Sequence, residues 1–189
     1  DNDIIIDVYT NGNAYAGLSL NGNVYTWGDI SYGGKLPIDK LSSIDEIFPL
    51  NKGFISRKLD KSSYIWGPDD VLDGSDGGRT INDDLSFSDI AHVVNNIKEV
   101  YYNDNAILIF RENNTIFSWG DILYGGVIPY SIYMELAGNI VDVKAYPQGF
   151  IIIKDNGDVL IWGGFDGKSG NTMSLRLDKN GLRSTSNDV

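Results

Sequence analysis

The chain has 189 residues, of which 42% are hydrophobic, 12% are aromatic and 22 are glycine, a composition typical of a folded, turn-rich β domain rather than a disordered chain. Its formal net charge of −11 repels phosphate backbones, so nucleic acid is excluded as an expected partner, whereas basic proteins remain compatible. Without cysteine the chain has no disulfide, thiol nucleophile or cysteine-based metal site, and its apolar runs are too short to cross a bilayer.

A pattern of seven columns occurs four times along the chain, each time ending on Trp-Gly. An acid stands 20 residues before each tryptophan, and a small residue followed by a large apolar one begins 13 residues before it. Such periodicity predicts a repeat protein, and one tryptophan at a fixed column in each unit predicts a buried core contact made four times. The tryptophans are Trp27, Trp66, Trp119 and Trp162, and the acids are Asp7, Glu46, Glu99 and Asp142.

Each repeat begins with a short alternating stretch, which is typical of a half-buried strand. In the first repeat an apolar run at 15–20 follows, then the turn Asn21-Gly22, and then a strand at 24–27 that carries the tryptophan. Asn-Gly favours a two-residue hairpin because both central residues need positive φ. The same order recurs three times, so each repeat is predicted to be an antiparallel sheet of at least three strands.

The connections between repeats cover residues 29–43, 68–96 and 121–139. The first and third contain a Tyr-Gly-Gly sequence, at Tyr32 and at Tyr124. Short helical turns are expected in the connections. One is capped by Ser88 with Ile90, Val93 and Val94 on one face, and another begins at Pro129 with Ile132, Tyr133 and Leu136 on its apolar side.

Beyond residue 164 the pattern fades into a polar stretch. We therefore divide the chain into a four-repeat domain at 1–164 and a closing strand or linker at 165–189.

Acidic side chains gather in the second connection, and several carboxylates within reach of one another suit Ca²⁺. The spacing matches no EF-hand loop, so a solvated loop without bound metal is the favoured interpretation, with Ca²⁺ as the alternative. For the repeated acid of the strands, bonding to local backbone is favoured over a cation path. The clustered residues are Asp69, Asp70, Asp73, Asp76, Asp83 and Asp84.

No motif of catalysis or cofactor binding is present. The single histidine, His92, has no nucleophile or acid placed beside it by any pattern. We therefore expect a protein without enzymatic activity and without a cofactor.

Recognition is expected on the loops that follow Trp-Gly, because their length and chemistry differ between repeats while the strand columns are fixed. Tyrosine gives a large rigid contact area, and the acidic loop would steer basic partners. For Tyr32 and Tyr124 the alternative, packing against the Gly-Gly turn of their own repeat, is equally favoured. The predicted contacts are Tyr32, Tyr124, Tyr130, Tyr133, Asp69, Asp70, Asp73 and Asp76.

The Trp-Gly and Asn-Gly columns over residues 3–164 resemble the repeats of the regulator of chromosome condensation family. The unit length and the Gly-Gly-x-Leu/Ile-Pro loops, as at Gly33-Gly34-Lys35-Leu36-Pro37, look closer to short-blade bacterial members. Those members include a secreted propeller that inhibits β-lactamase and repeats of bacterial toxins and surface proteins. The resemblance implies an all-β propeller of about four blades, whereas the family usually closes with seven.

The function that the resemblance implies is a non-catalytic protein-recognition module of a bacterial secreted or surface toxin or adhesin, with the cytoplasm as the other setting. The alternatives are an inhibitor of an enzyme and a nucleotide-exchange factor for a Ran-type GTPase. The exchange alternative is disfavoured because the Gly-Gln-Leu-Gly loop ending is missing. Expected partners are another protein and, at the open edges of the ring, further blades of a longer chain or a second copy.

Overall fold

The structure, a computed structural model, describes residues 3–67, 94–164, 172–178 and 181–185. The chain forms two compact units, one comprising 1–75 with 84–99 and the other 76–83 with 100–189. The predicted helical turn at Ser88, the histidine His92 and the acidic cluster at 69–84 lie outside the described residues.

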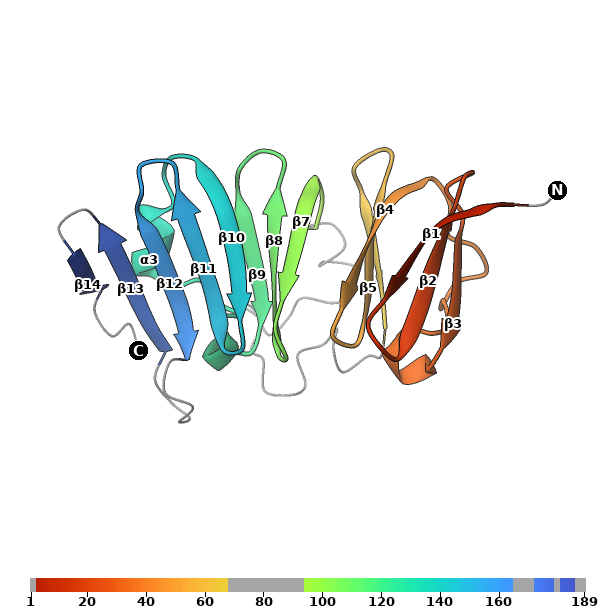
Figure 1. The fold of residues 1–189 in the computed structure, drawn as a ribbon, viewed down its shortest axis with the longest axis horizontal. Helices are drawn as coiled ribbons and strands as arrows, with labels where there is room; N and C mark the ends of the chain where they lie inside the picture. Colours follow the sequence, from red (N-terminus) through yellow and green to blue (C-terminus); the bar gives the residue numbers. More distant parts are fainter. Residues whose placement is uncertain (1–2, 68–93, 165–171, 179–180, 186–189) are drawn as a thin grey trace. The chain divides into compact units, whose positions relative to one another are not determined.

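The described residues form four antiparallel sheets, one for each repeat, in which consecutive strands are neighbours (Figure 1). The first two sheets contain β1 (Ile5–Thr10), β2 (Ala14–Ser19), β3 (Val24–Gly28), β4 (Ile44–Leu50), β5 (Gly53–Lys58) and β6 (Ser63–Trp66). The third contains β7 (Ile97–Tyr102), β8 (Ala106–Arg111) and β9 (Ile116–Gly120). The fourth contains β10 (Ile140–Tyr146), β11 (Gly149–Lys154), β12 (Val159–Gly164), β13 (Thr172–Asp178) and β14 (Gly181–Thr185).

Helices are few and short among the described residues. They are the 3-10 turns η1 (Ile30–Tyr32) and η2 (Ile122–Tyr124) and the α-helix α3 (Tyr130–Glu135). The helix α3 begins directly after Pro129, as predicted. In this part of the chain no helix is long and apolar enough to cross a membrane. The predicted all-β, propeller-like architecture of four repeats is confirmed.

The strand register explains two of the repeated columns. In every sheet the tryptophan pairs directly with the large apolar residue of the preceding strand, for example Phe150 with Trp162. The repeated acid stands where the register of the first strand shifts by one residue, as at Asp7 and Asp142. Their carboxylates accept the next residue's N–H at 2.8 and 2.9 Å, so the predicted local backbone bond is confirmed for both.

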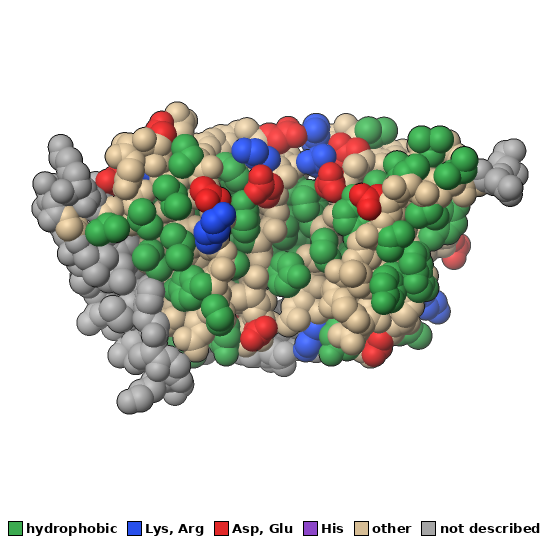
Figure 2. Space-filling model, in the orientation of Figure 1, with side chains coloured by type: hydrophobic (Ala, Val, Ile, Leu, Met, Phe, Trp, Pro, Cys, Tyr) green, Lys and Arg blue, Asp and Glu red, His purple; other side chains and the backbone are tan. Residues whose placement is uncertain are grey.

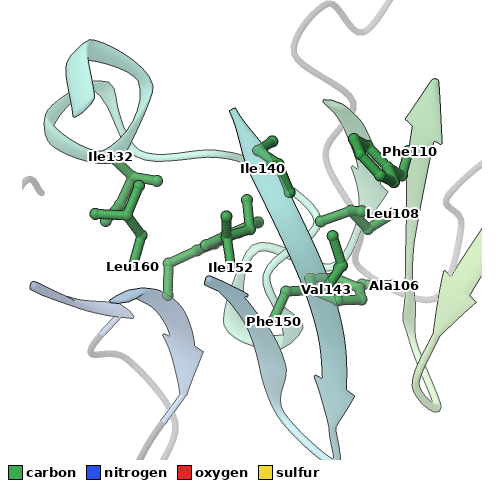
Figure 3. Close-up of a cluster of buried hydrophobic side chains, with 10 residues drawn as sticks. Ala106, Leu108, Phe110, Ile132, Ile140, Val143, Phe150, Ile152 and Leu160 are labelled. Atoms are coloured by element: carbon green, nitrogen blue, oxygen red, sulfur yellow. The ribbon is translucent and has the colours of Figure 1, made fainter. Parts of the chain in front are cut away.

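Two hydrophobic cores of the same design lie between consecutive repeats. In the first unit, Ala14, Ala16 and Leu18 of β2 pack against Phe54 and Trp66 of the second sheet. In the second unit the equivalent side chains of β8 pack against Phe150, Ile152 and Trp162 of the fourth sheet (Figure 3). The middle strands β2 and β8 therefore each present alternate residues to the repeat that follows.

Candidate functional site

The two Tyr-Gly-Gly loops connect the first repeat to the second and the third to the fourth, each through the tryptophan of the following repeat. Asp29 and Asp121 cap η1 and η2, and the glycines after them, Gly33 and Gly125, have φ of 87° and 84°. The carbonyl oxygens of these glycines accept the indole Nε1–H of Trp66 and of Trp162, both at 3.0 Å. A Cβ at Gly125 would lie 2.9 Å from the Phe150 ring, so glycine lets the aromatic pair approach the loop.

The exposure of the four tryptophans differs, and the two that bond to a Tyr-Gly-Gly loop, Trp66 and Trp162, are buried. Trp66, Trp119 and Trp162 are buried, as predicted. For Trp27 the prediction is wrong, because its side chain is 43% exposed and only stacks on Tyr15, with ring centroids 5.6 Å apart. The physical reason is that Trp66 and Trp162 are covered by the loop of the preceding repeat, whereas none of the described residues supplies such a loop to Trp27.

Tyr32 and Tyr124 occupy equivalent places and are half-buried against the cores of their units. Their carbonyl oxygens accept the side-chain amides of Asn11 and Asn103, each at 2.9 Å. Both tyrosines thus pack on a core, and the alternative of packing against the Gly-Gly turn of their own repeat stays a prediction. A partner contact through the remaining exposed part of Tyr124 stays a prediction.

Tyr130 and Tyr133 are placed differently, on the solvent side of α3. They are 71% and 63% exposed, and Met134 beside them is 60% exposed. On the other side of the helix Ile132 is fully buried and points toward Leu160 (Figure 3). The expectation that Tyr133 belongs to the apolar side is therefore wrong, whereas Ile132 and, at the C-cap, Leu136 do pack on the core as predicted. Residues 130, 133 and 134 share the opposite face.

The structure does not gather Tyr124 with Tyr130 and Tyr133 at one end of the strands. The Tyr124 carbonyl accepts a hydrogen bond from Asn103, which lies in the β7–β8 turn. The last carbonyl of α3, that of Glu135, instead accepts one at 2.7 Å from Lys154, which lies where β11 turns into β12. In an antiparallel sheet these turns lie at opposite ends. The single recognition face expected from the sequence is thus divided in this unit.

A pocket of about 490 Å³ opens beside Tyr124 in the second unit. Its walls are mostly apolar, and one acid and one amide are among the lining residues. Tyr146 donates its hydroxyl to the Trp162 carbonyl at 3.0 Å, and burial raises the pKa of that phenol, so it stays protonated at neutral pH. The lining residues are Asp104, Tyr124, Tyr146, Pro147, Gln148, Ile151, Ile161 and Gly164.

Sequence reasoning missed this pocket because Ile151 and Ile161 have the pattern of ordinary core residues. The same columns hold Ala16 and Thr26 in the first repeat, and Leu108 and Ser118 in the third. The second repeat has isoleucines there too, Ile55 and Ile65, and both are buried, so the columns alone do not distinguish the fourth repeat.

Charged side chains do not form a cluster suited to a metal ion among the described residues. Figure 2 shows that uncharged side chains, many of them apolar, cover most of the described surface on the face drawn. The predicted Ca²⁺ alternative concerns residues outside the described part of the chain.

No protein-family model and no curated protein matches the sequence. Solved structures do match. Prp20p from Saccharomyces cerevisiae has a TM-score of 0.53 and 16% identity over 86% of this chain and 44% of that chain. The yeast RCC1 (Prp20) structure with Kap60 has the same TM-score and identity, over 86% and 42%. Human WBSCR16 has a TM-score of 0.55 and 15% identity over 86% and 48%.

The chain therefore has an RCC1-like propeller fold, and it spans less than half the length of these relatives.

Proposed function

We propose that this chain is a non-catalytic protein-recognition module and that the solvent face of α3, formed by Tyr130, Tyr133 and Met134, contacts the partner. The observation that carries the proposal is that three large side chains on one helix face are each at least 60% exposed, while Ile132 anchors the helix from behind. Tyrosine is enriched in protein interfaces because it buries much surface at little entropic cost.

The anchoring makes this face suited to binding. Lys154 is buried and donates to the last carbonyl of α3, and Asn114 donates its amide to the Gly138 carbonyl at 3.1 Å. The short helix is thus held at its C-terminal end, so the tyrosines are presented from a fixed backbone.

The partner is proposed to be a basic protein, because the chain has a net charge of −11. Prp20p, whose fold is similar, is described with its binding to Gsp1p and to histones. Histones and a Gsp1p-type GTPase are therefore the first two proteins to test for binding. A bacterial secreted or surface setting stays part of the proposal and is supported by the sequence resemblance alone.

The test compares a Tyr130→Ser/Tyr133→Ser double variant with a matched control, Ile30→Ser/Leu59→Ser, whose two side chains are each 68% exposed. Binding of each probe is measured by biolayer interferometry at physiological salt. We expect the tyrosine variant to lose about tenfold or more in affinity, with an unchanged thermal midpoint, because a tyrosine at the centre of an interface contributes about 2 kcal/mol or more.

Equal losses of affinity in both double variants would contradict the assignment of the binding face to α3. If the unsubstituted chain bound neither the histones nor the GTPase, the proposed class of partner would be contradicted. Accelerated nucleotide release from the GTPase would support the exchange alternative, and inhibition of an enzyme without a role for α3 would support the inhibitor alternative.

A further inference from the structure

The two faces of a repeat have different chemistry. In the second and fourth repeats one face presents an aromatic residue paired with the tryptophan, and it packs on the preceding repeat. In the first and third repeats the opposite face receives that pair from the following repeat. In the first unit Phe54 and Trp66 pack on Ala16, and in the second unit Phe150 and Trp162 pack on Leu108 (Figure 3).

The first repeat has a presenting face that no described residue covers. Its pair, Tyr15 and Trp27, occupies the register of Phe54 with Trp66 and of Phe150 with Trp162. The rings are stacked nearly parallel, 6° apart, yet Tyr15 is 39% exposed and Trp27 43%. Phe54 and Phe150 are fully buried. The aromatic pair of the first repeat is therefore formed and stacked, but no described residue covers it.

The fourth repeat has a receiving face that is only partly covered. Ile151 and Ile161 pair across β11 and β12 in the register of Leu108 with Ser118, which are buried beneath the following repeat. Ile151 and Ile161 are instead half-buried, and both line the pocket beside Tyr124. A volume of about 490 Å³ falls in the range of pockets that hold drug-sized ligands, so an aromatic side chain fits.

We propose that a second copy of this chain inserts its Tyr15–Trp27 pair into this pocket, so that copies associate head to tail through the contact that consecutive repeats already make. This is a heterologous contact, in which two different surfaces of the same chain are complementary. A second copy is the favoured occupant because the contact occurs once within each unit of this chain.

Charge gives the association a defined salt dependence. Two chains of net charge −11 repel each other, while the proposed contact surfaces are aromatic and aliphatic. Salt screens the repulsion with little effect on apolar contacts. Self-association through this contact therefore strengthens as sodium chloride is raised, the opposite of an association driven by ion pairs.

Sedimentation velocity over a concentration series tests the proposal, with Trp27→Ala as the variant and Tyr130→Ala as the control. Tyr130 belongs to the partner surface on α3, so the outcome is independent of the proposed function. We expect the unsubstituted chain and Tyr130→Ala to self-associate alike, and Trp27→Ala to weaken association about tenfold or more. A chain that stays monomeric throughout, or equal association of Trp27→Ala, would overturn the proposal.

Crosslinking identifies the two surfaces, since the chain has no cysteine of its own. Asn103 donates to the Gly149 carbonyl at 3.5 Å between the third and fourth repeats. In the proposed contact Tyr146 of one copy stands in the column of Asn103, and Ala14 of the other copy stands in the column of Gly149. Pro147 and Asn13, which are next to them in the chain, therefore come close together. Copies with Asn13→Cys mixed with copies with Pro147→Cys should be joined by a short bismaleimide, and neither variant alone should be. Crosslinking of Asn13→Cys copies with one another would instead show a symmetric contact and overturn the head-to-tail arrangement.

Discussion

At the scale of single residues, the burial of a repeated side chain is decided by the neighbouring repeat. Trp27 and Trp162 stand in the same column and pair with an aromatic residue in the same register. Trp162 is fully buried and donates to the Gly125 carbonyl, whereas Trp27 is 43% exposed. Sequence columns predict what a residue can contact, and the covering loop decides whether the contact is made.

Substituting the two tryptophans should separate these situations. Trp162→Ala should lower the free energy of unfolding by about 3–5 kcal/mol, because it leaves a cavity in the second core. Trp27→Ala should cost far less, since it removes partly solvated surface. Urea denaturation of both variants measures the difference, and equal losses would contradict the assignment of Trp27 to an uncovered face.

Glycine at the loop can be tested with a matched pair. Gly125 and Gly157 have φ of 84° and 83°, but a Cβ at Gly125 would lie 2.9 Å from the Phe150 ring, whereas nothing lies within 4 Å of one at Gly157. Gly157→Ala should cost only the left-handed backbone strain, about 1–3 kcal/mol. Gly125→Ala should cost measurably more in the same thermal unfolding assay. An equal cost would mean that the loop does not hold the aromatic pair.

At the scale of elements, the residues before β1 are tied to the β2–β3 turn by one carboxylate. Asp3 accepts hydrogen bonds from Ser19, Asn21, Asn23 and Tyr25 at 2.6–3.0 Å. These bonds, that of Asn23 foremost, lower the pKa of Asp3 to about 2. The arrangement depends on the geometry of the turn and could not be predicted from the columns alone.

The pH dependence follows from the direction of that shift. A lowered pKa means that the stabilising contribution of Asp3 is fully present above the ordinary carboxyl pKa of about 3.9 and is lost as pH falls through about 2. An NMR titration of the Asp3 carboxyl carbon should give a midpoint near 2. In Asn23→Ala the midpoint should rise toward the ordinary value, and by more than in Asn21→Ala. A wild-type midpoint near 3.9 would show that the cluster does not form in solution.

At the scale of the whole molecule, the sequence predicted the fold well because repetition presents the same evidence four times. Hairpin turns, strand pairing and α3 after Pro129 all depend on local chemistry. The candidate surfaces were harder to predict. The exposed face of α3 depends on which side chains reach the core, and the pocket at Ile151 and Ile161 depends on whether another repeat covers them.

Dependence on tertiary packing also explains why the prediction of one recognition face for Tyr124, Tyr130 and Tyr133 is wrong. Tyr124 and Tyr130 are close in sequence and both follow Trp-Gly. The chain between them passes from one end of the sheet toward the other, and only the bonds of Asn103 and Lys154 reveal it.

The second and fourth repeats place their tryptophans on the loop of the repeat before them, whereas no described residue gives Trp27 such cover. Hydrogen exchange of the indole Nε1–H groups, followed by NMR in D₂O with dilute protein, distinguishes the covered from the uncovered tryptophans. The indoles of Trp66 and Trp162, each bonded to a glycine carbonyl at 3.0 Å, should exchange slowly, and that of Trp27 should exchange rapidly. Rapid exchange at Trp66 and Trp162, at the rate found for Trp27, would contradict the repeat-to-repeat contact and with it the proposed contact between copies.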